Sequence, residues 1–253
     1  MKDELTIVSK REELQRAWAI AVKDMKIYYL RPPAIVFGIL FPFTLFLSFA
    51  VGRNIPMDRL MPALVAQTVF WASSSIGPVS IPMERRLKTF DRYLSAPISL
   101  VSVLLGKTLA GTIFGIAISA LSLLFGLFAL GTVSSIALLL LGIIISSFGF
   151  SAMGIMFASI PSETPGEVMM PMTFVRIPLL FISGLYIPLD QLPPIGLTAA
   201  FFSPLTHTLD LIKLGIGGYS FFGVAANIAM LLLYTGLFIG IGINFHRRIM
   251  RRE

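Results

Sequence analysis

The sequence predicts an all-α integral membrane protein, and three observations lead to that prediction. Hydrophobic residues make up 56% of the 253-residue chain and charged residues only 13%, whereas soluble domains carry roughly 25% charged residues. The apolar residues are gathered in blocks of about twenty or more, the length that a helix needs to cross a bilayer. The charged residues stand between those blocks. We therefore expect one transmembrane domain over residues 1–253 and no sizeable soluble domain.

The N-terminal segment, residues 11–30, is predicted to form an amphipathic helix. Leu14, Trp18 and Met25 fall on one helical stripe, while most charged residues fall elsewhere. This pattern fits a helix that lies in the plane of the membrane interface. A solvated helix packed on another protein is the alternative. Arg31-Pro-Pro then ends the helix and turns the chain into the membrane.

Six apolar segments are expected to span the membrane: residues 34–51, 60–83, 100–128, 136–159, 168–187 and 221–245. Two of these spans have clear start signals. Ser99 is a plausible N-cap for the third span. Thr164-Pro-Gly-Glu167 places a capping hydroxyl, a proline and an acid where the fifth helix should begin.

A charged stretch, residues 84–97, separates the second and third spans. Leu87, Phe90 and Leu94 recur at the spacing of one helical face, Glu84 and Lys88 stand one turn apart, and Pro97 marks the stop. The stretch is too polar for hydrocarbon. It is therefore predicted to be a short amphipathic helix outside the bilayer, whose apolar face needs a partner.

Residues 190–213 are moderately apolar but are interrupted by prolines. The number of crossings decides their placement. If the basic residues before the first span, in the 84–97 stretch and after the last span are all cytoplasmic, the chain crosses exactly six times. Residues 190–213 then form two short helices that dip in from the outer face and return. Both termini are expected to be cytoplasmic, in a multi-pass plasma-membrane protein.

Enzymatic motifs are absent from the sequence. It has no His-Glu-x-x-His and no Gly-x-Ser-x-Gly, and its lack of cysteine excludes disulfides and thiolate metal sites. Gly106-Lys107-Thr108 is similar to the end of a phosphate loop but lacks the upstream glycine, so no nucleotide site is expected. Lys107 is instead predicted to snorkel to the headgroups. We expect no catalytic residue, cofactor or metal in this chain.

Arg176 is the one charge predicted in the middle of a span. At the bilayer centre it should cost on the order of 2.5 to 3.5 kcal/mol. It is therefore expected to face protein or a cavity. One interpretation is a structural tie to carbonyls or polar side chains, and the other is a place on the substrate path.

Two Gly-x-x-x-Gly pairs could bring helices close together. They are Gly111 with Gly115 and Gly236 with Gly240. Because glycine is frequent in this chain, ordinary packing within the chain is favoured over a dimer contact.

Several of these segments match a known family. Pro178-Leu-Leu-Phe-Ile-Ser-Gly184, then Ile187-Pro-Leu-Asp-Gln-Leu-Pro193, then Ser203-Pro-Leu-Thr206 with Asp210 form the most specific match. Together with Arg31-Pro-Pro, Phe41-Pro42 and the 84–97 stretch, they resemble the permease subunits of type-2 ABC transporters over nearly the whole chain. Arg86-Leu87 is less usual for that family, Ser203 stands where asparagine is common, and Arg176 is not a usual family residue.

The resemblance implies that ATP and Mg are bound by a partner, an ABC ATPase present in two copies. It also implies a second permease chain, identical or a close paralogue. Residues 84–97 would be the coupling helix that receives the ATPase. The residues assigned to ATPase coupling are Glu84, Arg85, Leu87, Phe90, Asp91, Arg92 and Leu94. The residues assigned to an outer gate are Pro188, Asp190, Pro193 and Pro204.

The function predicted from these features is ATP-driven export of an amphipathic substrate, such as a drug, an antibiotic or a lipid-like molecule. A lipid-linked polysaccharide or an ion is an alternative cargo. A secondary transporter would need ionisable residues inside the membrane, of which only Arg176 qualifies. Nucleic-acid binding is not expected despite the net charge of +7, because the basic residues cluster at the ends of the apolar segments.

Overall fold

The computed structural model describes residues 10–53, 55–95, 98–130 and 133–250, and their regular structure is helical. The helices are α1 (Lys10–Tyr28), α2 (Pro32–Ile35), the π-helix η1 (Val36–Leu40), α3 (Phe41–Ala50), α4 (Met57–Arg86), α5 (Phe90–Ser95), α6 (Leu100–Leu130), α7 (Ile136–Phe157), α8 (Pro165–Ile182), the 3-10 helix η2 (Leu189–Gln191), α9 (Pro194–Phe201), α10 (Pro204–Ile216) and α11 (Val224–Met250).

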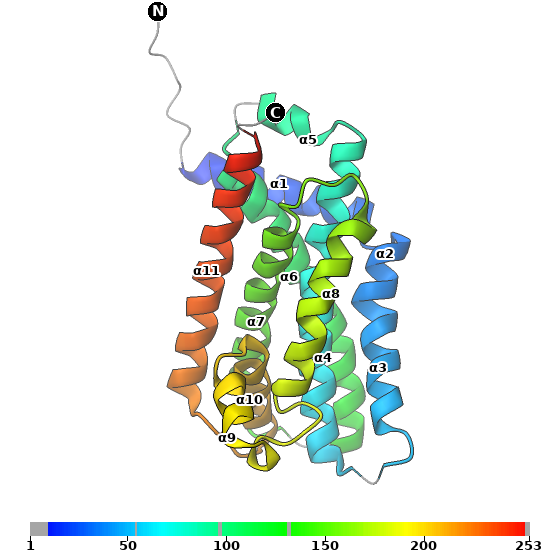
Figure 1. The fold of residues 1–253 in the computed structure, drawn as a ribbon, viewed down its shortest axis with the longest axis vertical. Helices are drawn as coiled ribbons and strands as arrows, with labels where there is room; N and C mark the ends of the chain where they lie inside the picture. The colour runs from blue at the N-terminus through cyan, green and yellow to red at the C-terminus, as the bar shows by residue number, and fades with distance from the viewer. Residues whose placement is uncertain (1–9, 54, 96–97, 131–132, 251–253) are drawn as a thin grey trace, which may run out of the picture.

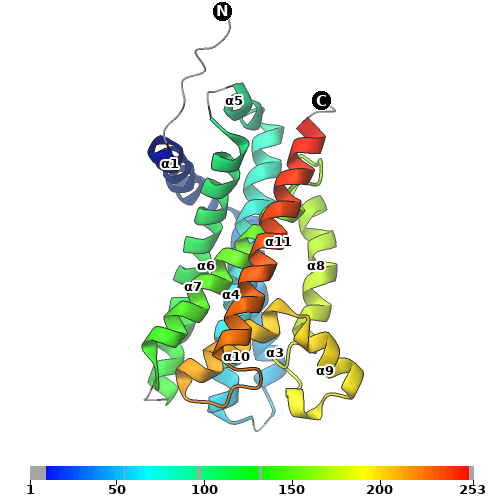
Figure 2. The same cartoon turned by 90° about the vertical axis from the view of Figure 1, so that its left-hand side faces the viewer.

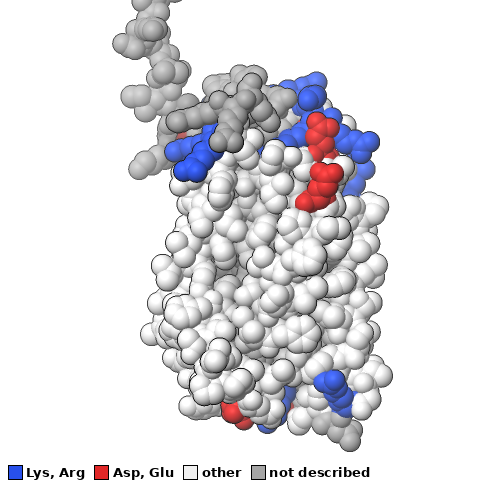
Figure 3. All heavy atoms as spheres, viewed as in Figure 1, with Lys and Arg blue, Asp and Glu red and all other residues white. Residues whose placement is uncertain are grey.

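The long helices run side by side along one axis, and the shorter ones close the two ends (Figures 1 and 2). We call the end that carries α1, α5 and the last turn of α11 the basic end. The end that carries η2, α9 and α10 is the distal end. Lysine and arginine side chains gather at the basic end, while the middle of the visible face is nearly free of charge (Figure 3). This charge distribution is that of a membrane protein.

Five helical stretches of the described chain are long and apolar enough to cross a membrane: Pro32–Ala50, Leu100–Leu124, Ile136–Phe157, Pro165–Ile182 and Val224–Ile249. The sixth long helix, α4, has 30 residues but carries more polar side chains. Each of these helices overlaps one of the segments predicted from the sequence. The chain is an all-α integral membrane protein.

Helix α4 is the centre of the bundle. Every residue from Met61 to Pro82 is buried, because α6, α7, α8 and the first span surround it. Its polar side chains face those neighbours rather than lipid: Gln67, Thr68, Ser73, Ser74, Ser75 and Ser80. The enclosure explains how so polar a helix fits in the membrane.

Glycines in α6 permit the closest of these contacts. A Cβ added at Gly111 or Gly115 would overlap Ser73 of α4, and one at Gly111 would also overlap Ser151 of α7. This first Gly-x-x-x-Gly pair therefore packs helices within the chain, as favoured from the sequence. A Cβ added at Gly236 or Gly240 in α11 would meet no atom of another described helix within 4 Å.

The starts of α6 and α8 follow the sequence signals, with one difference in chemistry. The Ser99 hydroxyl accepts a hydrogen bond from the Ser102 amide at 3.1 Å, so Ser99 caps α6. Helix α8 begins at Pro165, but the Thr164 side chain makes no capping bond. The Ser162 hydroxyl instead accepts from the Thr164 amide at 3.0 Å and donates to Glu167 at 2.7 Å.

Candidate functional site

The stretch predicted as one helix over residues 84–97 is broken in the structure. Helix α4 continues through Arg86, and α5 begins at Phe90. Between them Lys88 has a φ of 54°. The Thr89 amide donates to the Glu84 carbonyl at 2.9 Å and the Lys88 amide to the Arg85 carbonyl at 3.0 Å. This is the Schellman arrangement that ends a helix, with lysine where glycine is usual.

The break separates the apolar residues that were expected to share one face. Leu87 is 63% exposed, whereas Phe90 is 4% exposed and packs in a cluster that includes Ile81 and Val103. Phe90 therefore cannot dock on a partner from this position, and that part of the prediction is corrected. The side chains of Asp91 and Leu94 lie outside the described residues. Arg92 is exposed.

Arg85 faces inward, like Phe90. Its guanidinium donates to the Ile160 carbonyl at 2.5 Å and lies 5.7 Å from the centre of the Phe90 ring. Because Ile160 lies between α7 and α8, Arg85 ties the end of α4 to that loop.

Four charged side chains meet inside the basic end, and we call Lys23, Asp24, Glu84 and Lys107 the buried charge cluster. The Lys107 ammonium lies 3.0 Å from Asp24 Oδ2 and 2.6 Å from Glu84 Oε2. The Lys23 ammonium lies 2.6 Å from Asp24 Oδ1 and also contacts Glu84. Asp24, Glu84 and Lys107 are buried, while the Lys23 side chain is 31% exposed. Two cations and two carboxylates balance, which makes the burial of the other three tolerable.

The buried charge cluster joins three helices and contacts a fourth. Lys23 and Asp24 belong to α1, Glu84 to α4 and Lys107 to α6. The Lys23 ammonium also donates to the Tyr93 hydroxyl of α5 at 2.6 Å. Burial alone would lower the pKa of Lys23, but the carboxylates of Asp24 and Glu84 outweigh it and raise that pKa. The cluster thus fixes α5 to the bundle through charged partners.

Two sequence predictions are wrong at this cluster. Lys107 was expected to reach the headgroups but is fully buried, because two carboxylates from other helices meet it inside. Glu84 was placed beside Lys88, yet it pairs with Lys107 and Lys23, while Lys88 lies 3.9 Å from Glu163. Lys23 and Glu84 are 61 positions apart in the sequence, and Lys107 and Asp24 are 83 positions apart. The one sequence feature that could have indicated the buried charge cluster is Lys107, a lysine within an apolar segment.

Arg176 is fully buried against α4. Its Nη2 donates to Ser74 Oγ at 2.5 Å, with Ser75 Oγ at 3.5 Å, and the guanidinium lies 4.7 Å from the centre of the Trp71 ring. Within the described residues, Nε and Nη1 have no hydrogen-bond partner, and no carboxylate lies within ion-pair distance. The group is held by hydroxyls and a ring rather than by an opposite charge.

The residues predicted for an outer gate lie together at the distal end. Pro188 precedes η2, Asp190 lies in η2, Pro193 precedes α9 and Pro204 begins α10. Helices α9 and α10 meet at an angle of 84°, and both stay at the distal end (Figures 1 and 2).

Asp210 ties this bent pair to α11. Its carboxylate accepts from the Ser220 hydroxyl at 2.6 Å, the Phe221 and Phe222 amides at 2.8 and 3.1 Å, and the Asn227 amide group at 2.7 Å. Because four donors bind one carboxylate, Asp210 holds α10 firmly against the start of α11.

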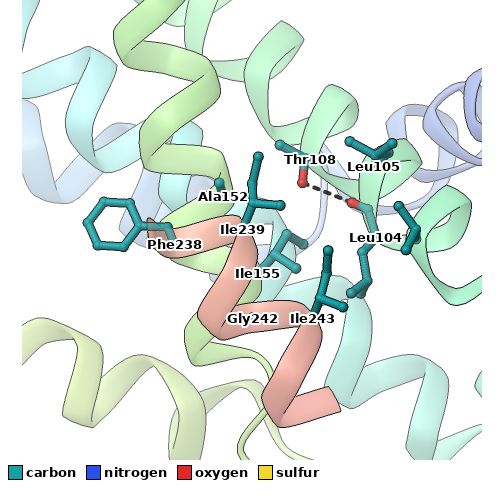
Figure 4. A pocket seen from close by; sticks show the side chains of 10 residues that line it. Leu104, Leu105, Thr108, Ala152, Ile155, Phe238, Ile239, Gly242 and Ile243 are labelled. Carbon is teal, nitrogen blue, oxygen red and sulfur yellow. Dashed lines mark hydrogen bonds between the residues drawn. The ribbon is translucent and has the colours of Figure 1, made fainter. Parts of the chain in front are cut away.

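Two hollows differ in what they could hold. A cleft of about 620 Å³ opens at the distal end, and we call it the distal cleft. Figure 4 shows a much smaller apolar cavity of about 20 Å³, between α6, α7 and α11. The Thr108 hydroxyl at its edge already donates to the Leu104 carbonyl at 2.8 Å. The small cavity has room for little more than one water molecule.

These features define a class of protein: a polytopic α-helical membrane subunit with a rigidly mounted turn at its basic end and a bent helix pair at its distal end. The model of the ABC-2 type transporter family matches residues 14–216. The chain belongs to this family, as the resemblance in its sequence indicated.

Two curated relatives are named nodulation protein J. The one from Rhizobium leguminosarum bv. trifolii is 31% identical over 90 residues, which cover 36% of this chain and 34% of the relative. The one from Rhizobium leguminosarum bv. viciae is 31% identical over 108 residues, which cover 42% and 41%. Each match thus spans less than half of the relative.

Proposed function

We propose that the chain is the permease subunit of an ATP-driven exporter that moves an amphipathic substrate outward, such as a drug, an antibiotic or a lipid-like molecule. The observation that carries the proposal is the mounting of the turn between α4 and α5. Leu87 projects from this turn into solvent, while Phe90 and the buried charge cluster fix its base to α1, α4 and α6. A push on the turn is therefore passed to three helices at once.

The push would come from a separate ABC ATPase, as membership of the family implies. In this proposal two ATPase copies bind ATP and Mg, two permease chains pair in the membrane, and the basic end faces the cytoplasm because of its lysines and arginines. The distal end then faces outward.

Five of the seven residues assigned to ATPase coupling have described side chains, and these five divide into two groups. Leu87 and Arg92 are exposed and suit direct contact with the ATPase. Glu84, Arg85 and Phe90 point inward and position the turn instead. The proposed docking surface is thus centred on Leu87, with basic side chains around it.

The cargo is proposed to be amphipathic because the distal cleft combines aromatic walls with charged side chains. A lipid-linked polysaccharide has the same two-part chemistry and is the alternative cargo.

The docking proposal predicts that Leu87→Asp releases the ATPase and leaves the permease intact. A buried leucine contributes about 1.5 to 3 kcal/mol, so the affinity should fall by about tenfold or more. Co-purification of the tagged permease with its ATPase measures this. Leu87→Met, which keeps an apolar side chain of similar volume, is the matched control and should retain the ATPase. Recovery of the ATPase at the wild-type ratio with Leu87→Asp would rule out this docking surface.

A further inference from the structure

The distal cleft has the size and the walls of a ligand site. Its volume of about 620 Å³ lies within the roughly 300 to 1,000 Å³ of small-molecule sites. Phe46 and Phe49 of α3 and Tyr186 after α8 form an aromatic wall. The Phe49 and Tyr186 rings lie 4.3 Å apart, and the Tyr186 hydroxyl donates to Gln67 at 2.8 Å. The wall is therefore fixed in place before any ligand arrives.

Three cations line the cleft, and none of them forms an ion pair with a carboxylate of the described chain. They are Arg53, Arg59 and Lys213. Arg53 lies 4.2 Å from the centre of the Phe49 ring. Lys213 is partly buried on α10, where the charges of Asp210, Arg59 and Asp190 all reach it, although no carboxylate of the described chain lies within ion-pair distance. A partly desolvated ammonium near a second cation gains most from an incoming anion.

The carboxylates of the cleft do not fill that role. Asp210 lines the cleft, but its two oxygens are already occupied by four donors. Asp58 and Asp190 are exposed, and neither forms an ion pair with a cation of the described chain. Within the described residues, the side-chain donors of Lys213 and Arg59 therefore have no carboxylate within ion-pair distance, although Asp210 and Asp190 are near enough to act on Lys213.

We propose that the distal cleft binds the anionic headgroup of an amphiphile, with Lys213 and Arg59 as its ion-pairing residues and the aromatic wall against its apolar part. A phosphate or a carboxylate has the required chemistry. The amphiphile could come from the surrounding lipid or be the exported molecule itself. The proposal concerns the permease alone and does not rest on the partner ATPase.

The test uses the purified full-length chain in a neutral detergent, without ATPase or nucleotide. Dioctanoyl phosphatidylglycerol, dioctanoyl phosphatidylcholine and inorganic phosphate are added separately, and the apparent Kd is read from the rise in Tm with concentration. We expect the anionic lipid to bind at least tenfold more tightly than the zwitterionic lipid. If inorganic phosphate competes with it, the cations bind an anion even without an attached apolar part, which supports the ion-pairing role of Lys213 and Arg59. If phosphate does not compete, the cleft needs the apolar part as well. Both results support the site.

Variants locate the binding. Lys213→Gln and Arg59→Gln should each weaken phosphatidylglycerol binding about tenfold, since each removes a charge-assisted hydrogen bond. Lys213→Arg should retain binding. Lys26→Gln, which removes an exposed charge from α1 at the opposite end, should bind like the wild type. Equal binding of both lipids, or equal loss in Lys26→Gln, would overturn the proposal. Because the assay contains no ATPase, its failure would leave the docking experiment on Leu87 unaffected.

Discussion

Lys107 shows how much a single buried charge depends on its partners. Its ammonium lies between Asp24 and Glu84 with no exposed surface. Removing one member of a buried ion pair costs about 3 to 5 kcal/mol, because the remaining charge is left without compensation. The same reasoning applies to a cluster of four charges that balance.

We therefore predict that Lys107→Met strongly destabilises the protein. Its Tm and its abundance in the membrane should both fall. Adding Glu84→Gln to this variant restores the balance of one cation and one carboxylate, so the double variant should recover part of the lost Tm. Thermal melting of the purified variants, combined as a double-mutant cycle, measures the coupling. A wild-type Tm for Lys107→Met would contradict the role given to the cluster.

Arg176 presents the opposite case, a buried cation without an anion. Two of its three nitrogens lack partners in the described chain, so its charge lowers stability rather than raising it. Its described contacts are to Ser74, Ser75 and the Trp71 ring, as the structural tie predicts, and it lines neither the distal cleft nor the small cavity. Because an intramembrane charge is costly, a place on the substrate path stays a prediction that transport measurements test.

The prediction is that Arg176→Gln keeps or raises the Tm, since the unpaired charge is gone, yet loses transport in proteoliposomes that contain the ATPase. Arg176→Lys should lose less transport. A lower Tm for Arg176→Gln would mean that the bond to Ser74 is structural. Normal transport by this variant would exclude the substrate path.

At the scale of the elements, helix starts were predictable and the break before α5 was not. Ser99 and Pro165 carry local signals that a sequence displays. The left-handed residue that ends α4 is Lys88, and lysine gives no sign of this conformation where glycine would. The amphipathic spacing of Leu87 and Phe90 therefore suggested one continuous helix.

Substitutions at Lys88 test this helix end. Lys88→Gly should raise stability by about 1 kcal/mol, because glycine adopts a positive φ without strain. Lys88→Val should lower it, since a β-branched side chain disfavours that conformation. Thermal melting of the two variants shows whether each substitution raises or lowers the stability. Equal effects of glycine and valine would mean that the turn does not have the observed geometry.

At the scale of the whole molecule, the segments predicted from the sequence overlap the long helices and the bent pair of the described chain, but the sequence did not reveal which charges meet. The pattern of apolar segments is local, and the crossing count needs only the positions of basic residues. The buried charge cluster depends on how α1, α4 and α6 pack, and no spacing in the sequence encodes that. The distal cleft likewise forms from three segments that are far apart in the chain, around residues 46–63, 184–191 and 209–221.

The orientation of the molecule can be tested because the chain has no cysteine. Single substitutions can then be labelled without background. An impermeant thiol reagent should reach Asp58→Cys and Asp190→Cys in intact cells, but not Lys88→Cys or Arg248→Cys. Labelling after cell lysis is the control for accessibility. Labelling of Arg248→Cys from outside would mean that the α9–α10 pair crosses the membrane.

The enclosure of α4 also bears on how the chain is made. A helix with this many polar side chains has little tendency to enter lipid on its own, and α6 and α7, which cover most of it, are synthesised later. During synthesis Asp24 and Glu84 likewise emerge before Lys107. Helix α6 supplies both a covering surface and the second positive charge of the cluster, so we expect α4 to become stable in the membrane only once α6 has been made.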